Sequence, residues 1–172
     1  LHFEGVKSAA FVWVNGTYAG YDQGGHTSAE FNITPYLKSG KNVLAVQVIR
    51  WSDGSYLENQ DSWNFSGIYR DVYLMAIPNT HIRDFFITTD LDEEYKDAEL
   101  KTKVSVKNYA KGNNIKYSIE SQLLDANGNS IFTANEKINV NANSEVSVEF
   151  NEKVKNPQKW SAEIPYLYDL VI

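Results

Sequence analysis

Apolar and polar residues alternate in short runs along most of the chain, and clusters of Gly, Asn, Asp and Ser separate these runs. A period of two residues is typical of β-strands that bury one face. We find no long segment with the 3.6-residue period of an amphipathic helix, no internal repeat and no low-complexity tract. The pattern therefore predicts an all-β protein built from short strands.

The first part of the chain contains the clearest local signal. Asn15-Gly16 separates the apolar runs Ala10–Val14 and Thr17–Tyr21. A two-residue Asn-Gly turn favours a β-hairpin, because both turn positions need a positive φ. Short strands are also expected within Leu1–Val6 and at Glu30–Ile33. After these, Thr34-Pro35 could cap one helical turn that runs through Leu37.

Two further runs predict longer strands. Val43–Ile49 is apolar except for Gln47, which predicts a strand buried on both faces at the centre of a sandwich. Ile68–Ile77 alternates, with Ile68, Val72, Leu74 and Ala76 on one face, and it is expected to form a single strand.

A domain boundary is predicted at Pro78-Asn79, since aromatic residues become rarer beyond it and Lys and Asn become more frequent. Strands of period two follow every 10–15 residues, as expected for an immunoglobulin-like β-sandwich. We predict two domains, residues 1–78 and 79–172. The expected strands of the second are Ile82–Thr89, Ala98–Asn108, Asn114–Asp125, Ser130–Ile138, Glu145–Phe150 and Tyr168–Ile172.

Composition narrows the function. The net charge of −6 argues against a nucleic-acid partner, because phosphate binding needs a basic surface. The absence of cysteine excludes disulfides, thiolate metal sites and a cysteine nucleophile. No apolar run approaches the roughly 20 residues of a membrane-spanning helix, so no membrane partner is expected. The first residue is Leu1 rather than a start methionine, so we expect the native N-terminus to lie outside this sequence and leave the compartment, bacterial cytoplasm or periplasm, undecided.

The stretch from Arg50 to Asp71 combines two tryptophans, two tyrosines and a phenylalanine with several carboxylates. Aromatic rings cover the C–H face of a pyranose and carboxylates accept hydrogen bonds from its hydroxyls, so this stretch is typical of a sugar site. Within it, Asp53-Gly54 could be a tight turn that closes a strand. Alternatively, Asp53 could bind sugar hydroxyls or a cation that prefers oxygen ligands, and the nearby Trp51 and Tyr56 favour that reading.

The other chemical groups carry weaker signals. A pair among Glu58, Asp61 and Asp71 could in principle serve glycoside hydrolysis, but their spacing selects no pair. Arg70-Asp71 is expected to be a structural ion pair on a sheet surface. Trp63 and Phe65 could form either a small core within the loop or a sugar platform. The three histidines have no metal-ligand spacing, which argues against a zinc site; they are His2, His26 and His81.

Four segments resemble glycoside hydrolase family 2. Residues 13–21 (WVNGTYAGY) and 30–46 are similar to its sugar-binding jelly-roll domain, and residues 50–72 (RWSDGSYLENQDSW…SGIYRDV) resemble the large β-galactosidases of that family. Residues 156–170 resemble the end of the immunoglobulin-like domain that follows. The resemblance implies part of a jelly-roll sandwich followed by an immunoglobulin-like β-sandwich.

The resemblance also implies an activity for the whole protein, the retaining hydrolysis of terminal β-D-galactosides by two glutamates of a (β/α)₈ barrel outside this sequence. Asp53 stands where the family has an aspartate that contacts galactose and binds sodium. The family further implies magnesium in the whole enzyme, a homo-oligomer, and the barrel as a partner. We expect this chain to bind no cofactor fully and to be inactive alone; the alternatives are a separate carbohydrate-binding module or a purely structural scaffold.

Overall fold

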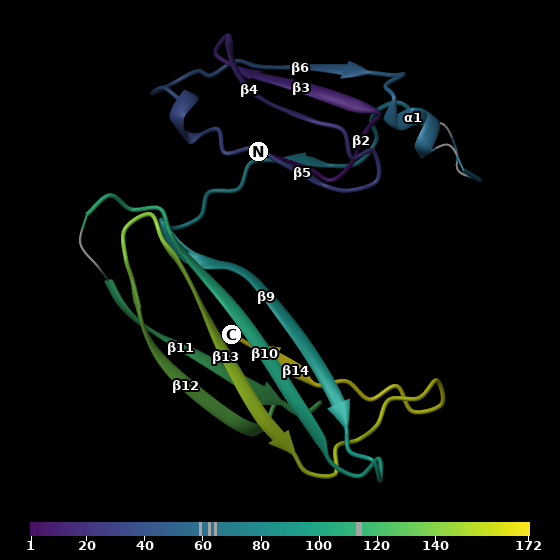
Figure 1. Cartoon of the computed structure of the whole chain (residues 1–172), viewed down its shortest axis with the longest axis vertical. Helices are drawn as coiled ribbons and strands as arrows, with labels where there is room; N and C mark the ends of the chain where they lie inside the picture. The colour runs from purple at the N-terminus through teal and green to yellow at the C-terminus, as the bar shows by residue number, and fades with distance from the viewer. Residues whose placement is uncertain (59, 62, 64, 113–114) are drawn as a thin grey trace. The chain divides into compact units, whose positions relative to one another are not determined.

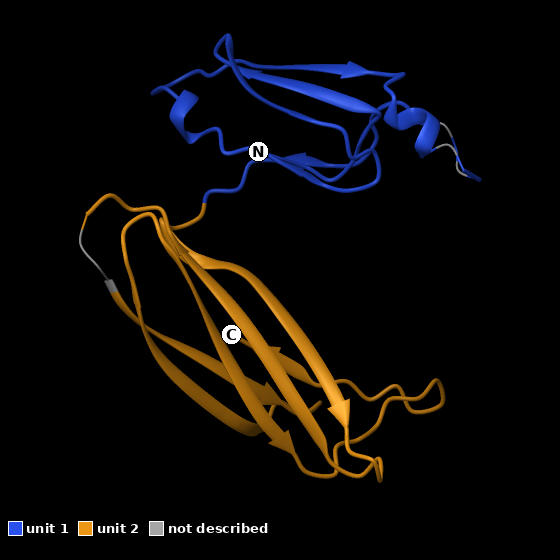
Figure 2. Ribbon diagram, viewed as in Figure 1, with its two compact units in different colours: residues 1–76 blue, residues 77–172 orange. Residues whose placement is uncertain are grey.

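The computed structural model describes residues 1–58, 60–61, 63, 65–112 and 115–172. The chain divides into two compact units, Leu1–Ala76 and Ile77–Ile172 (Figure 2). Both are built from antiparallel strands, and the helical elements are a single turn each (Figure 1). The predicted all-β class, part of a jelly-roll sandwich followed by an immunoglobulin-like sandwich, is confirmed.

The predicted hairpin is confirmed in unit 1. Strands β3 (Ala9–Val14) and β4 (Thr17–Asp22) pair through the turn at Asn15 and Gly16, whose φ values of 52° and 82° are those that a type I′ turn requires. Strand β6 (Leu44–Ile49) pairs with the other edge of β3, so β3 is the central strand.

The expectation that Val43–Ile49 is buried on both faces is wrong. Strand β6 is an edge strand of its sheet, and only Val46 and Val48 turn toward the core. On the other face Ala45 and Gln47 are exposed and Ile49 is half-buried, and Leu44 at the start of the strand is 45% exposed. The continuous apolar pattern is therefore compatible with an edge position, because hydrophobicity alone does not show which strand occupies the centre of a sheet.

The remaining strands of unit 1 are only two residues long. Strand β1 (His2–Phe3) lies between β5 (Ala29–Glu30) and β8 (Val72–Tyr73), and β2 (Val6–Lys7) pairs with β7 (Gly67–Ile68). They cover a core formed by Phe3, Val6, Ala10, Val12 and Ala29. The strand predicted at Glu30–Ile33 is thus present only at its first residue.

The prediction of one continuous strand from Ile68 to Ile77 is also wrong. Strands β7 and β8 are separated at Tyr69, whose backbone N–H donates to the carbonyl of Gly5, while Glu4 N–H donates to the carbonyl of Asp71. The break lies opposite the gap between the two partner strands β1 and β2, where the Tyr69 ring packs so closely that a Cβ on Gly5 would lie 2.8 Å from it. After Tyr73 the alternating residues are exposed and lie outside any strand.

One short helical element follows the expected position with a different cap. The 3₁₀ turn η1 (Thr34–Tyr36) starts with Pro35 in its first turn, but its N-cap residue is Ile33 rather than Thr34. The side chain of Asn32 accepts a hydrogen bond from Thr34 N–H at 3.1 Å. An asparagine outside the predicted cap position therefore supplies the acceptor that was expected from Thr34.

Unit 2 consists of two three-stranded sheets (Figure 1). One has the order β13-β10-β9, with β9 (Thr80–Leu91), β10 (Ala98–Asn108) and β13 (Glu145–Val154); the other has the order β12-β11-β14, with β11 (Ile115–Leu124), β12 (Ser130–Val140) and β14 (Asp169–Val171). These strands confirm the six that were predicted: β9, β12 and β13 are longer than expected, β10 has the expected bounds, and β11 and β14 are slightly shorter. The predicted strand start at Asn114 lies outside the described residues.

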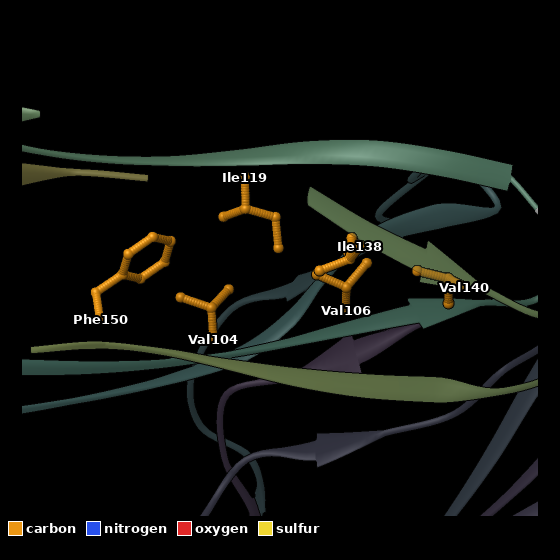
Figure 3. Packing of buried hydrophobic residues seen from close by; sticks show 6 residues of the cluster. All are labelled: Val104, Val106, Ile119, Ile138, Val140 and Phe150. Carbon is orange, nitrogen blue, oxygen red and sulfur yellow. The ribbon is translucent and has the colours of Figure 1, made fainter. Parts of the chain in front are cut away.

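The core of unit 2 lies between its two sheets. Figure 3 shows six buried side chains that point toward one another from four strands: Val104, Val106, Ile119, Ile138, Val140 and Phe150. A second cluster of Leu100, Leu123 and Val154 lies further along the strands. Two buried polar residues separate the two clusters. Thr102 lies between them on β10 and Ser121 lies between them on β11.

Candidate functional site

The candidate site begins where β6 ends. A single turn of α-helix, α1 (Gly54–Leu57), follows, and Asp53 is its N-cap residue. The Asp53 Oδ1 atom accepts a hydrogen bond from Gly54 N–H at 3.0 Å. The sequence predicted either a tight turn or a binding carboxylate here, and the structure gives Asp53 an exposed side chain at a helix start that the sequence analysis did not identify.

Buried serines hold this segment against the sheet. Ser8 Oγ donates to Ser52 Oγ at 2.7 Å and accepts from Ser52 N–H at 3.0 Å. Ser52 N–H also lies 3.1 Å from the hydroxyl of Ser55, which is buried inside α1. Because Ser8 is only 2% exposed, these bonds tie the residue before Asp53 to a rigid part of unit 1.

A second contact to Asp53 comes from the loop after β4. Gln23 Nε2 donates to Asp53 Oδ1, and Tyr21 Oη donates to Gln23 Oε1. Tyr21 and Asp53 are 32 positions apart in the sequence, and no motif linked them. Gln23 and Tyr21 are therefore neighbours of the carboxylate that no sequence pattern indicated.

The charge of Asp53 is detectable at Tyr21. Desolvation of the phenol raises the pKa of Tyr21 above its usual value of 10.0, and the negative charges of Asp53 and then Asp22 raise that pKa further. Tyr21 also contacts Phe11, with ring centroids 4.7 Å apart, on the face of the sheet that carries Trp13 and Tyr18. Rings on that face therefore continue toward the Asp53 side chain.

A further polar cluster lies beside the site. Lys7 is only 4% exposed, and its Nζ lies 3.2 Å from His26 Nε2. The loop carbonyl of Gly25 accepts a hydrogen bond from Tyr69 Oη at 2.6 Å. A Cβ on Gly25 would lie 2.7 Å from Glu58 Oε2 and 3.1 Å from Lys7 Cγ, so Lys7 and Glu58 both pack against this glycine. Glu58 thus lies within a structural cluster, a role that its sequence position did not indicate.

The aromatic residues of the stretch lie mostly at the surface. Tyr56 is 85% exposed and Trp63 is 82% exposed, so Trp63 does not form the loop core that was one of its two expected roles. Phe65 stacks on Tyr69 with centroids 6.1 Å apart, and the Arg50 guanidinium lies 5.1 Å from the centroid of the Trp51 ring. These rings are available for contact with a sugar or with another domain.

The other charged residues of the stretch have different surroundings from Asp53. Asp61 is exposed, with a φ of 53°. The expected ion pair between Arg70 and Asp71 is not found among the described residues, and Arg70 instead lies over the Tyr69 ring, 5.3 Å from its centroid. The stretch also includes Asn59, Ser62 and Asn64, which lie outside the described residues.

No group of three His, Cys, Asp or Glu residues that could hold a metal ion is found among the described residues. His2 lies 3.4 Å from a carboxylate oxygen of Glu30, and His81 Nδ1 lies 2.8 Å from the carbonyl oxygen of Pro78. Within the described part of the chain, no helix has the length and apolar character needed to cross a membrane.

The chain matches two parts of a known enzyme family. Residues 1–78 match the domain described as "Glycosyl hydrolases family 2, sugar binding domain", and residues 80–172 match the one described as "Glycosyl hydrolases family 2". Curated β-galactosidases of Priestia megaterium and Clostridium acetobutylicum are 44% and 42% identical over 172 residues, which is 100% of this chain. The chain spans only 17% and 18% of the length of these two relatives.

The chain is also similar to part of several solved glycoside hydrolase structures. A β-glucuronidase of Bacteroides uniformis is 29% identical, with a TM-score of 0.90 over 98% of this chain and 21% of its own. A glycosyl hydrolase family 2 member of Bacteroides cellulosilyticus is 26% identical, with a TM-score of 0.79 over 98% of this chain and 23% of its own.

Proposed function

The chain belongs to glycosyl hydrolase family 2, and from this we propose that it is a non-catalytic part of a retaining β-galactosidase that hydrolyses terminal β-D-galactosides. The curated relatives that match over the whole chain support this substrate class. The observation that carries the proposal is Asp53, an exposed carboxylate fixed on one oxygen at the start of α1. Asp53 contributes an accessory ligand for galactose hydroxyls, and the rest of the chain is a scaffold.

Catalysis itself is assigned to groups outside this chain. Retaining hydrolysis needs a general acid and a nucleophilic carboxylate about 5–5.5 Å apart on either side of the glycosidic bond. Asp53 already accepts hydrogen bonds from Gly54 N–H and Gln23, which suits a fixed acceptor for a sugar hydroxyl better than a group that forms a covalent bond. The catalytic barrel that the family resemblance implies supplies the two glutamates.

Asp53 is also proposed as one oxygen ligand of a sodium ion. Carboxylate and hydroxyl oxygens are ligands that hard cations prefer, and the Ser52 hydroxyl and Asp53 Oδ1 both lie against the amide nitrogen of Gln23. Since the described residues contain no cluster of three acidic or histidine groups, the chain contributes only part of a coordination shell. We assign no residue of this chain to magnesium.

The test uses the full-length protein that contains this chain. Asp53→Asn keeps the size of the side chain and removes its charge, so we expect kcat/KM for a chromogenic β-galactoside to fall about 100-fold or more, the usual cost of a lost charged substrate contact. Asp61→Asn is the matched control, because Asp61 lies in the same stretch and Asn accepts its positive φ. An Asp53→Asn enzyme with unchanged kinetics would contradict the proposal, as would hydrolysis by the 172-residue chain alone.

The exposed aromatic rings favour a second candidate, a separate carbohydrate-binding module. Trp63 and Tyr56 present large free faces of the kind that stack on sugars. This candidate requires the 172-residue chain to bind galactose saturably in titration calorimetry, with binding lost in Asp53→Ala. We expect no saturable binding, because one wall of a pocket buries too little of a monosaccharide. Absence of both galactose binding and any kinetic effect of Asp53→Asn would leave a purely structural scaffold.

A further inference from the structure

The two oxygens of Asp53 have different surroundings. Oδ1 accepts two hydrogen bonds, one from Gly54 N–H at 3.0 Å and one from Gln23 Nε2. Oδ2 accepts no hydrogen bond within the described part of the chain. The carboxylate is therefore oriented through one oxygen, while the lone pairs of the other remain available to a ligand.

The orientation of the Gln23 amide follows from its two neighbours. A carboxylate can only accept, so the NH₂ group of Gln23 must face Asp53. The amide oxygen then faces Tyr21, whose hydroxyl donates to it. Tyr21 is fixed in turn by its ring contact with Phe11 on the neighbouring strand β3. The Asp53 carboxylate thus determines which way the glutamine points its donor, and Tyr21 on strand β4 holds the opposite end of the amide by donating to its oxygen.

The space around Gln23 is matched to this arrangement. A Cβ on Gly54 would lie 2.9 Å from Gln23 Nε2, so the absence of a side chain at position 54 allows the amide to reach Asp53. Gln23 Nε2 also lies 3.4 Å from Ser52 Oγ, which is held by the buried Ser8. The amide of Gln23 therefore lies against both neighbours of Asp53, Ser52 and Gly54.

We propose that Gln23, held by Tyr21, is a positioning residue that fixes Asp53 through Oδ1 and presents Oδ2 to a hydroxyl of the galactoside. This inference rests on the proposed function and adds two residues to it. Gln23 itself touches neither the sugar nor the reacting atoms. Loss of Gln23 leaves Oδ1 held by Gly54 N–H alone, so Asp53 is fixed less firmly and the cost falls on substrate binding more than on the chemical step.

The raised pKa of Tyr21 supports this arrangement. The phenol has to stay protonated in order to donate to Gln23, and desolvation together with the charge of Asp53 favours that protonated form. The hydrogen-bond direction from Tyr21 to Gln23 to Asp53 therefore persists to a higher pH than a phenol with the usual pKa would allow.

The test compares two variants and two matched controls in the full-length enzyme. Gln23→Ala removes the amide, and we expect KM for a β-galactoside to rise about tenfold with kcat changed less than about threefold. Tyr21→Phe removes the orienting hydroxyl and is expected to raise KM by a smaller factor. Gln47→Ala and Gln47→Glu are the matched controls, because Gln47 is exposed on β6 of the same unit. Thermal melting of each variant reports whether the fold is intact.

Gln23→Glu gives a readout that a merely structural role would not produce. At pH 8 the introduced carboxylate repels Asp53 and KM should exceed that of Gln23→Ala. As the pH falls toward 5, the nearby like charge favours protonation of the introduced group, which can then donate to Oδ1. The ratio of the KM of Gln23→Glu to that of the parent enzyme should therefore decrease as the pH is lowered. The same ratio for Gln47→Glu should stay constant.

The outcomes separate this inference from the proposed function. If Asp53→Asn impairs the enzyme but KM and its pH profile are those of the parent enzyme in both Gln23 variants, the positioning role is wrong and the ligand role of Asp53 stands. If Asp53→Asn has no effect, both fail. If a single variant affects folding, a double variant tests whether Gln23 acts through Asp53. In an Asp53→Asn background, Gln23→Ala should raise KM less than twofold. An increase as large as in the parent background would contradict the inference.

Discussion

At the scale of single residues, the candidate site combines one position that the sequence identifies and several that it does not. Asp53 stands out because it lies in a run of aromatic and acidic residues that resembles a known family. Gln23 lies 30 positions earlier in a polar, glycine-rich loop, and its contact with Asp53 depends on how two loops fold together. A side chain whose role comes only from a long-range hydrogen bond leaves no local pattern to detect.

The charge of Asp53 can be measured through Tyr21. Desolvation is the largest cause of the raised pKa of Tyr21, and the charge of Asp53 is the next. We expect Asp53→Asn to lower the pKa of Tyr21 in the 172-residue chain, though not to its usual value, and Asp22→Asn to lower it less. An NMR titration of the tyrosine ring signals from pH 8 to 12 measures both effects.

The same pKa has a consequence for stability. The folded chain favours the neutral phenol of Tyr21, so its contribution to stability is fully present below about pH 10 and is lost as the pH rises through the raised value. Asp53→Asn should therefore weaken the loss of stability at alkaline pH. A larger pKa decrease in Asp22→Asn than in Asp53→Asn would contradict the arrangement of Tyr21, Gln23 and Asp53.

At the scale of elements, long strands with one face on the core of the sandwich were predicted well. Residues 98–108 alternate regularly, and β10 has the expected bounds because it lies at the centre of its sheet with one face on the core. Ile68–Ile77 alternates just as well, yet its pairing stops at Tyr69, where Gly5 interrupts the partner strands. The interruption belongs to a segment more than 60 positions away, which a local period does not include.

The end of β10 depends on one buried polar side chain. Asn108 is 0% exposed; its Oδ1 accepts from Thr80 Oγ1 at 3.0 Å and from Ala110 N–H at 2.9 Å, and its Nδ2 donates to the carbonyl of Val140 at 3.3 Å. Asn108→Ala leaves one buried carbonyl and two partly buried donors without this partner and should lower the free energy of unfolding of unit 2 by about 2–4 kcal/mol.

Native-state hydrogen exchange of the β10 amides in the 172-residue chain measures that loss separately from unit 1. The control is Asn135→Ala, an exposed asparagine on β12, for which a change within about 0.5 kcal/mol is expected. A loss below about 1 kcal/mol for Asn108→Ala would show that water or local rearrangement replaces its hydrogen bonds.

At the scale of the whole molecule, the chain exposes apolar residues on the edge strand β9. Phe85 and Ile87 pair with Val104 and Thr102, so they lie on the core-facing side of the sheet, yet Phe85 is 58% and Ile87 40% exposed. Phe86, on the opposite side, is 68% exposed. An edge strand with unpaired backbone groups and exposed apolar side chains is a template for pairing with another chain.

We therefore expect the 172-residue chain to self-associate through β9. Sedimentation velocity should show species larger than a monomer as the concentration rises to about 100 μM, in the range where exposed strand edges pair. Phe85→Lys combined with Phe86→Lys should restore a monomer, because charged side chains on an edge strand oppose pairing and desolvation. Thr88→Lys is the control, since it adds a charge to β9 without removing an apolar side chain. A parent chain that stays monomeric over this range would show that β9 does not act as such a template, and association that persists in the double variant would move the contact to another edge, such as β4 or β6 of unit 1.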